Sequence, residues 1–231
     1  MTSTAVCPQL TLESARRLQE EEGRKRKAAE GTAYPFKGPC DSKTLGSSGV
    51  VYAVATENGT QLYANPHDKG HVKVKMSSVL GGKPSCVVGN GRPSGLCCTH
   101  AIPQSSVTID FKAWRVADIE KYVIRHGNSG GGYKRLKSWV LEASVNAKDW
   151  VVIDRQDHDR SPLPDAAFST AAFPLGDEKL VVVKQEGGFR YIKLTQTGKN
   201  SGGSNGPNDK LYLAGIVFNG SLLPPPAGGA E

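Results

Sequence analysis

The stretch from Tyr122 to Ile153 decides the fold class of this chain, and it reads YVIRHGNSGGGYKRLKSWVLEASVNAKDWVVI. Three short runs rich in Val, Ile, Tyr and Trp are separated by turn-forming residues, which is the pattern of consecutive antiparallel strands. Trp139, Leu141 and Ala143 fall on one face of the middle run, and the residues between them fall on the other. The stretch therefore predicts consecutive antiparallel strands, with these three side chains on the same face of the middle one.

The rest of the chain extends this β pattern. It has 231 residues, 38% of them hydrophobic, with 27 Gly and 14 Pro, which favours one loop-rich β domain with tails. We predict a partly helical N-terminal extension at residues 1–45, with the helix at 11–29, a β-sandwich at 46–221 and a Pro/Gly-rich tail at 222–231. The predicted strands are Val50–Ala55, Val72–Ser77, Val107–Phe111, Ile119–Arg125, Trp139–Ser144, Val151–Ile153, Leu180–Lys184, Arg190–Leu194 and Tyr212–Phe218. The intervals Gly81–Gln104 and Asp154–Asp177 are predicted to be long loops.

Charge and cysteine usage limit the classes of partner and compartment. The formal net charge is +7, from 29 Lys and Arg against 22 Asp and Glu, which by itself does not indicate nucleic acid. No apolar stretch approaches the roughly 20 residues needed to span a bilayer, so membrane insertion is not expected. Five cysteines without framework spacing fit reduced thiols. We expect a cytoplasmic location, with the nucleus as the alternative.

Five short motifs carry a family resemblance. They are NPHDKG at 65–70, TIDF at 108–111, YVIRH at 122–126, RYIKL at 190–194 and LYLAGIVFNG at 211–220. In this order they resemble the galactose-binding-like, discoidin-type (coagulation factor type C-like) β-sandwich superfamily, and most closely the intracellular versions attached to ubiquitin ligases and BTB/kelch scaffold proteins. The resemblance covers roughly residues 65–220 and implies an all-β sandwich of jelly-roll type that binds partners rather than performing chemistry.

The polar set Asp110, Arg125 and His126 is the strongest candidate for recognition. An Arg can bind a carboxylate or phosphate through two parallel hydrogen bonds, and His adds a proton-sensitive donor or acceptor. The structural alternative is that Arg125 pairs with Asp110 or caps a loop carbonyl. No nucleophile accompanies the set, so we do not expect an enzyme.

Loops at one end of a sandwich are the usual place for recognition chemistry on a rigid support. The glycine run at 129–132 would let a ligand approach the backbone closely, and basic side chains follow it. The predicted partner-binding residues are Asn65, His67, Thr99, His100, Arg125, His126, Lys134 and Arg135.

A zinc site at Cys86, Cys97, Cys98 and His100 is disfavoured by spacing. Adjacent cysteines on a strand point to opposite faces, and no Cys-x-x-Cys pair exists. We therefore expect free thiols, with no metal and no cofactor.

The three tryptophans have different expected roles. Trp139 and Trp150 flank one predicted hairpin and should fill the sandwich core. Trp114 follows a predicted strand and is either a core residue or a ring exposed for stacking on a sugar or peptide.

These patterns predict a non-enzymatic binding or structural module. Its partner would be a protein or peptide, within a multi-subunit complex. A carbohydrate-binding, lectin-like module is the alternative, with a glycan as ligand. A ubiquitin-ligase-associated substrate-recognition subunit is less favoured, and no nucleic acid is expected.

Overall fold

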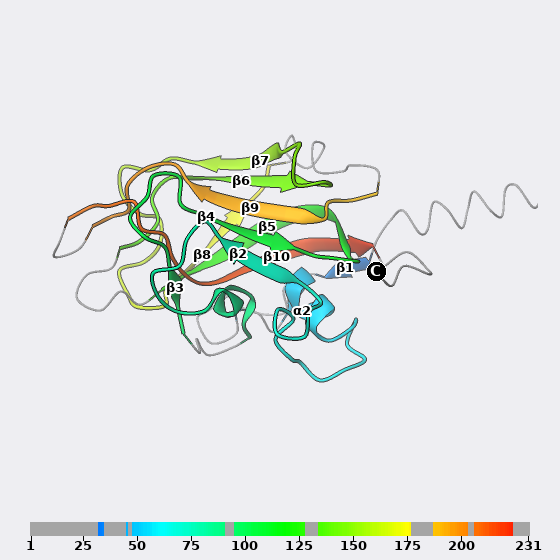
Figure 1. The fold of residues 1–231 in the computed structure, drawn as a ribbon. Helices are drawn as coiled ribbons and strands as arrows, with labels where there is room; N and C mark the ends of the chain where they lie inside the picture. The colour runs from blue at the N-terminus through cyan, green and yellow to red at the C-terminus, as the bar shows by residue number, and fades with distance from the viewer. Residues whose placement is uncertain are drawn as a thin grey trace, which may run out of the picture.

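Two antiparallel sheets stack as the two layers of a sandwich in the computed structural model (Figure 1). The structure describes residues 32–34, 45, 48–90, 95–127, 134–176, 187–202 and 206–223. The predicted helix at 11–29, the predicted strand at 180–184 and the tail from residue 224 lie outside the described residues. The all-β sandwich expected from the sequence is confirmed.

The first sheet has the strand order β1-β10-β5-β8, and β3 also pairs with β10. Its strands are β1 (Thr32–Tyr34), β3 (Cys97–Cys98), β5 (Arg115–His126), β8 (Thr170–Pro174) and β10 (Tyr212–Leu223). Every pairing among them is antiparallel. The two long strands β5 and β10 form the centre of this sheet.

The second sheet has the strand order β2-β4-β9-β6-β7. Its strands are β2 (Lys73–Met76), β4 (Ser106–Asp110), β6 (Trp139–Ser144), β7 (Val151–Gln156) and β9 (Tyr191–Gln196). In β4 and β9 buried and half-buried side chains alternate, so one face of each strand points into the sandwich. These strands lie where the sequence predicts them, within a few residues at their ends.

The core lies between the sheets and is rich in aromatic side chains. Trp139, Leu141 and Ala143 of β6 are each 0% exposed, so they share one face as predicted, and the predicted core position of Trp139 is confirmed. The Trp139 ring meets the Phe173 ring edge to face at 4.9 Å, and Tyr122 stacks on Phe173 at 5.2 Å. Since Tyr122 and Phe173 come from the first sheet and Trp139 from the second, these rings hold the two layers together.

The segment predicted as a strand at Val50–Ala55 is instead a helix, α2 (Gly49–Ala55). Its Val residues favour a strand. Six of the seven residues of the helix are nevertheless buried, because the helix packs against β10 of the sandwich. A short apolar run looks the same as a buried strand or a buried helix, because neither shows a polar face. The prediction is wrong for that reason.

Both predicted long loops contain structure. The 3₁₀-helix η1 (Pro84–Val88) and β3 lie within the interval 81–104, and β8 lies within 154–177. Strand β3 has only two residues, and β8 reads TAAFP, with little β propensity and a terminal proline. Both strands form because a longer strand beside them supplies the hydrogen-bond partners.

The strands of the Tyr122–Ile153 stretch do not all pair with one another. Strands β6 and β7 form the predicted hairpin, whereas β5 belongs to the opposite sheet and pairs with β10 and β8. Alternation of side chains identifies a strand but not its partner.

The predicted core position of Trp150 is also wrong. Its ring lies half-buried against Tyr191, with centroids 6.5 Å apart, and the Lys193 ammonium sits 4.0 Å from its centroid. Lys193 and Tyr191 alternate with the buried residues of β9, so Trp150 packs on the outer face of the sheet.

Candidate functional site

Several of the predicted binding residues meet at the start of β10. Thr99 is fully buried, and its Oγ1 accepts a hydrogen bond of 2.9 Å from the backbone N–H that precedes β10. His126 lies opposite Leu213 in the β5–β10 pairing, and the Lys134 ammonium is 5.7 Å from the centroid of the Tyr212 ring. The structure therefore brings Thr99, His126 and Lys134 together at one end of the sandwich, beside β3 (Figure 1).

Arg135 lies in the same region and is held by the chain itself. Its backbone N–H donates to Ser201 Oγ at 2.9 Å, and its Nη1 donates to the Leu163 carbonyl at 3.1 Å. Its Nη2 lies 3.3 Å from Asp165 Oδ1. These contacts fix the guanidinium among the loops rather than extending it into solvent.

Arg125 and His126 are buried, with 1% and 0% of their surface exposed. Arg125 donates to the Leu45 carbonyl at 3.4 Å, whereas Asp110 pairs with Arg190 at 2.8 Å. Of the two structural alternatives for Arg125, the structure shows the bond to a loop carbonyl. Burial lowers the pKa of His126 to about 4, and the positive charge of Arg135 adds to this effect, so the imidazole is neutral at physiological pH.

Asn65 and His67 organise a turn. Asn65 Nδ2 donates to the Ser85 carbonyl at 3.0 Å, and its Oδ1 accepts the backbone N–H of His67. His67 Nδ1 accepts the backbone N–H of Val74 at 2.9 Å, which anchors the turn to β2. Of the eight predicted residues, only His100 has an exposed side chain. None of these contacts tests partner binding, so the assignment of the eight residues stays a prediction.

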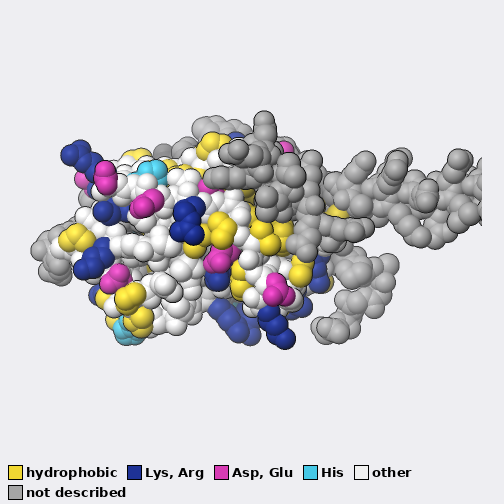
Figure 2. Space-filling model, turned by 90° about the horizontal axis from the view of Figure 1, so that it is seen from above, with side chains coloured by type: hydrophobic (Ala, Val, Ile, Leu, Met, Phe, Trp, Pro, Cys, Tyr) yellow, Lys and Arg dark blue, Asp and Glu magenta, His cyan; other side chains and the backbone are white. Residues whose placement is uncertain are grey.

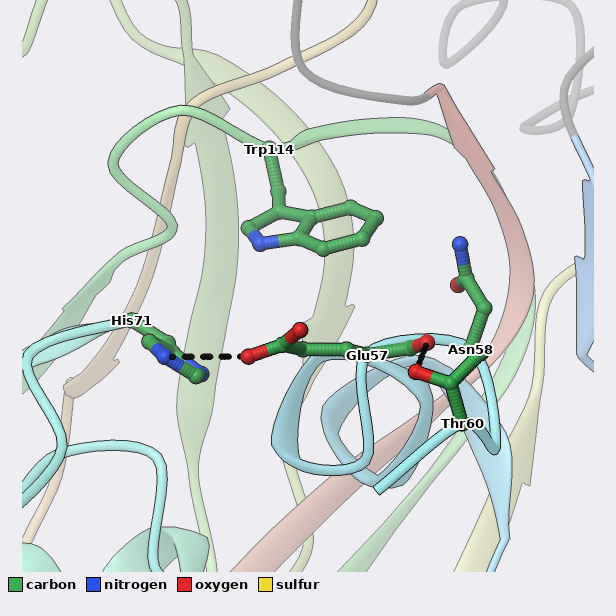
Figure 3. Close-up of a pocket in the computed structure, with 5 residues that line it drawn as sticks. All are labelled: Glu57, Asn58, Thr60, His71 and Trp114. Carbon is green, nitrogen blue, oxygen red and sulfur yellow. Dashed lines mark hydrogen bonds and ion pairs between the residues drawn. The ribbon is translucent and has the colours of Figure 1, made fainter. Parts of the chain in front are cut away.

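The structure reveals a pocket that sequence reasoning did not assemble. This pocket, which we call the Trp114 pocket, has a volume of about 380 Å³ and opens to the surface (Figure 3). It is lined by Glu57, Asn58, Thr60, His71 and Trp114. The first three come from the turn after α2, His71 precedes β2, and Trp114 lies between β4 and β5. Figure 3 shows the Trp114 indole above the Glu57 side chain, with His71 at the end of the Glu57 carboxylate.

The turn that carries Glu57 is tightly built. Thr56 Oγ1 donates to the Tyr52 carbonyl at 2.9 Å and closes α2, after which Glu57 and Asn58 adopt positive φ angles of 47° and 62°. Thr60 Oγ1 donates to the Glu57 carbonyl at 2.8 Å, and His71 Nε2 lies 3.8 Å from Glu57 Oε1. The Asn-Gly dipeptide at 58–59 signals this turn in the sequence, but nothing in the sequence places Trp114 beside it.

The cysteines form no metal centre in the described part of the chain. Cys86, Cys97 and Cys98 are free thiols, and no group of three or more potential ligands there could hold an ion. The hydrogen bond with Cys86, together with burial, raises the pKa of Cys97. Among the described residues there is also no helix long and apolar enough to cross a membrane.

Two curated relatives match the chain in sequence. It is 30% identical over 181 residues to E3 ubiquitin-protein ligase hecd-1 of Caenorhabditis elegans, a match that covers 76% of this chain and 6% of the ligase. It is 25% identical over 182 residues to E3 ubiquitin-protein ligase Ufd4 of Drosophila melanogaster, again covering 76% and 6%. The chain thus spans only about 6% of the length of each relative. No known protein-family model matches it.

Solved structures with a similar arrangement include sugar-binding domains. A CBM32-3 module from a family 31 glycoside hydrolase of Clostridium perfringens has a TM-score of 0.47 at 13% identity, covering 67% of this chain and 94% of the module. The lectin domain of lectinolysin, complexed with Lewis B antigen, has a TM-score of 0.46 at 15% identity, covering 64% and 92%. The chain is an all-β sandwich of two antiparallel sheets, and it is similar in sequence to a segment of E3 ubiquitin-protein ligases.

Proposed function

We propose that this chain is a non-enzymatic, cytoplasmic binding module that docks a protein or peptide partner within a larger assembly. The docking surface consists of the loops at the start of β10. One observation carries the proposal: exposed apolar side chains gather on two loops that hydrogen bonds tie together.

The apolar side chains are Val79 and Leu80, each 46% exposed, and Ile102, 52% exposed. The backbone N–H of Leu80 donates to the Cys98 carbonyl at 2.8 Å, and the N–H of His100 donates to the Ser78 hydroxyl of the first loop at 3.1 Å. We call this surface the loop-end patch. Single exposed apolar residues are common, but three on loops fixed to each other resemble a protein contact surface.

The charge around the loop-end patch indicates the character of the partner. Burial raises the pKa of Cys98, and the positive charges of Lys210 and Lys134 oppose that rise, which places both lysines near this thiol. Figure 2 shows hydrophobic side chains among Lys, Arg and His side chains, with some Asp and Glu, at the left end of the molecule. A segment that combines apolar and acidic side chains would complement such a surface.

A double variant tests the proposal. Leu80→Asp with Ile102→Asp should abolish recovery of the partners that the tagged wild-type chain captures in affinity purification with mass spectrometry. Val145→Asp is the matched control, because Val145 is 38% exposed in the turn between β6 and β7. If both variants recover the same proteins as the wild type, the loop-end patch is not the docking surface.

A carbohydrate-binding module is the second candidate, and the Trp114 pocket favours it. An aromatic ring above polar side chains can stack on a sugar while the polar groups bind its hydroxyls. A glycan array probed with wild type and Trp114→Ala distinguishes the candidates, since only a lectin would lose a glycan signal in that variant.

The matched ligases suggest what the larger assembly does. Because this segment corresponds to about 6% of each ligase, we assign it no transfer chemistry of its own. Substrate recognition for ubiquitin transfer is the role within an assembly that this similarity supports. A ubiquitin ligase among the proteins that the double variant loses would be the supporting result.

A further inference from the structure

We propose that the Trp114 pocket binds the ammonium group of a lysine side chain presented by the protein partner. The inference rests on the proposed function, because the lysine belongs to the protein partner that the module docks. Its site is built from residues outside the loop-end patch.

The pocket combines two features that favour a cation. The face of an indole ring attracts a cation through its quadrupole, and Trp is the strongest of the aromatic side chains in this respect. The carboxylate of Glu57 lies beside that ring (Figure 3). No lysine or arginine lines the pocket, so both groups attract an incoming cation.

Cations of the chain lie over several of its half-buried aromatic rings. Lys193 lies 4.0 Å from the Trp150 centroid, and Arg190 lies 5.0 Å from the Tyr191 centroid. Among the described residues, no such cation lies over Trp114. The Trp114 ring, which lines the same pocket as the Glu57 carboxylate, is therefore open to a cation from a partner.

Glu57 retains capacity to accept hydrogen bonds. Its Oε1 faces His71 Nε2 at 3.8 Å, which is too long for a hydrogen bond. Within the described residues no lysine or arginine nitrogen lies within ion-pair distance of this carboxylate. The side-chain groups of Asn58 and Thr60 complete the rim with further oxygen atoms.

An ammonium fits this geometry better than a guanidinium. With one oxygen of Glu57 turned toward His71, the carboxylate offers a single well-placed acceptor rather than two parallel ones. A guanidinium is a planar fork suited to two parallel bonds, whereas an ammonium is a compact point charge with donors in several directions. A phosphate or carboxylate ligand would be repelled by Glu57.

Nuclear magnetic resonance of the ¹⁵N-labelled full chain tests the inference. The indole N–H signal of Trp114, identified by its loss in Trp114→Phe, should shift in a saturable manner with Nα-acetyl-lysine methylamide. The uncharged analogue Nα-acetyl-norleucine methylamide should leave it unmoved. Glu57→Gln should weaken binding of the lysine probe about tenfold, as expected for loss of one charge contact of about 1.4 kcal/mol.

The matched control is Glu142→Gln, which removes a carboxylate paired with Lys193 at 2.9 Å on the outer face of the second sheet. It should bind the lysine probe as the wild type does. Trimethyl-lysine and arginine probes distinguish the kind of cation, and tighter binding of arginine would contradict the choice of ammonium.

Two results would overturn the inference. One is a Trp114 signal that no lysine probe shifts. The other is a signal that methyl β-galactoside shifts while the lysine probe does not, which would make the pocket a sugar site. Loss of partner recovery in the Leu80→Asp/Ile102→Asp variant concerns a different surface, so failure of the docking proposal and failure of this one are distinguishable.

Discussion

The hydroxyl of Tyr122 donates a hydrogen bond of 2.6 Å to Oδ2 of Asp154, and so joins β5 of one sheet to β7 of the other. Trp139 Nε1 donates to the same hydroxyl at 2.9 Å, and Gln156 Nε2 donates to Asp154 Oδ2 at 2.8 Å. Burial raises the pKa of Tyr122, so the phenol keeps its proton and remains a donor. This chain of hydrogen bonds inside the apolar core thus fixes how the two sheets pack against each other.

Tyr122→Phe should lower the free energy of unfolding by about 2–3 kcal/mol, because it leaves a buried carboxylate short of a donor. Urea denaturation at neutral pH measures the change. Tyr63→Phe is the control, since its hydroxyl bonds the Val88 carbonyl at 2.8 Å in a half-buried loop, and it should cost only about 1 kcal/mol. Equal losses in the two variants would show that this chain of hydrogen bonds has no special role in joining the sheets.

Trp139→Ala should be among the most destabilising substitutions, at about 3–5 kcal/mol, because the ring is fully buried between the layers. Trp150→Ala, on the outer face, should cost about 1 kcal/mol through loss of the contact with Lys193. Thermal denaturation of both variants checks the order. A Trp139 variant that melts with the wild type would contradict the core position.

The sequence predicts the strands of this protein better than its pairings. Strand β6 lies at Trp139–Ser144, where alternation predicts it, because one side of that strand must be buried. The helix at Gly49–Ala55 and the strand at Thr170–Pro174 are missed because tertiary contacts, not local propensity, determine them.

The candidate sites show the same limit. The sequence left open whether Arg125 and His126 serve recognition or structure, and the structure buries both, since the end of β5 lies between β8 and β10. The Trp114 pocket is formed by three segments separated by up to about 57 positions in the sequence. No residue spacing in the sequence indicates that these segments lie together in the fold. Only the single ring of Trp114 could be singled out in advance.

A pair of glycine substitutions tests the loop that carries the apolar patch. Gly82 has φ +78°, and a Cβ there would lie 1.7 Å from the Leu96 carbonyl oxygen, so Gly82→Ala must displace backbone. Gly70 has φ +79° but open space around the same position, so Gly70→Ala carries only the conformational cost of about 1 kcal/mol. In denaturant titrations Gly82→Ala should lose at least about 2 kcal/mol more than Gly70→Ala. Matching losses would mean that the loop moves freely aside.

The last prediction concerns acid sensitivity through His126. Burial lowers the pKa of this imidazole from 6.5 to about 4, so the unfolded chain binds the proton more readily than the folded one. The contribution of His126 to stability is therefore complete above pH 6.5 and is lost as the pH falls from 6.5 toward 4, by up to about 3 kcal/mol. His126→Gln should flatten the fall in unfolding free energy across this window in urea titrations, whatever its effect at neutral pH. His100→Gln, at an exposed position, is the control and should keep the wild-type slope. If His126→Gln keeps that slope as well, another group causes the acid sensitivity and the imidazole is not held neutral by burial.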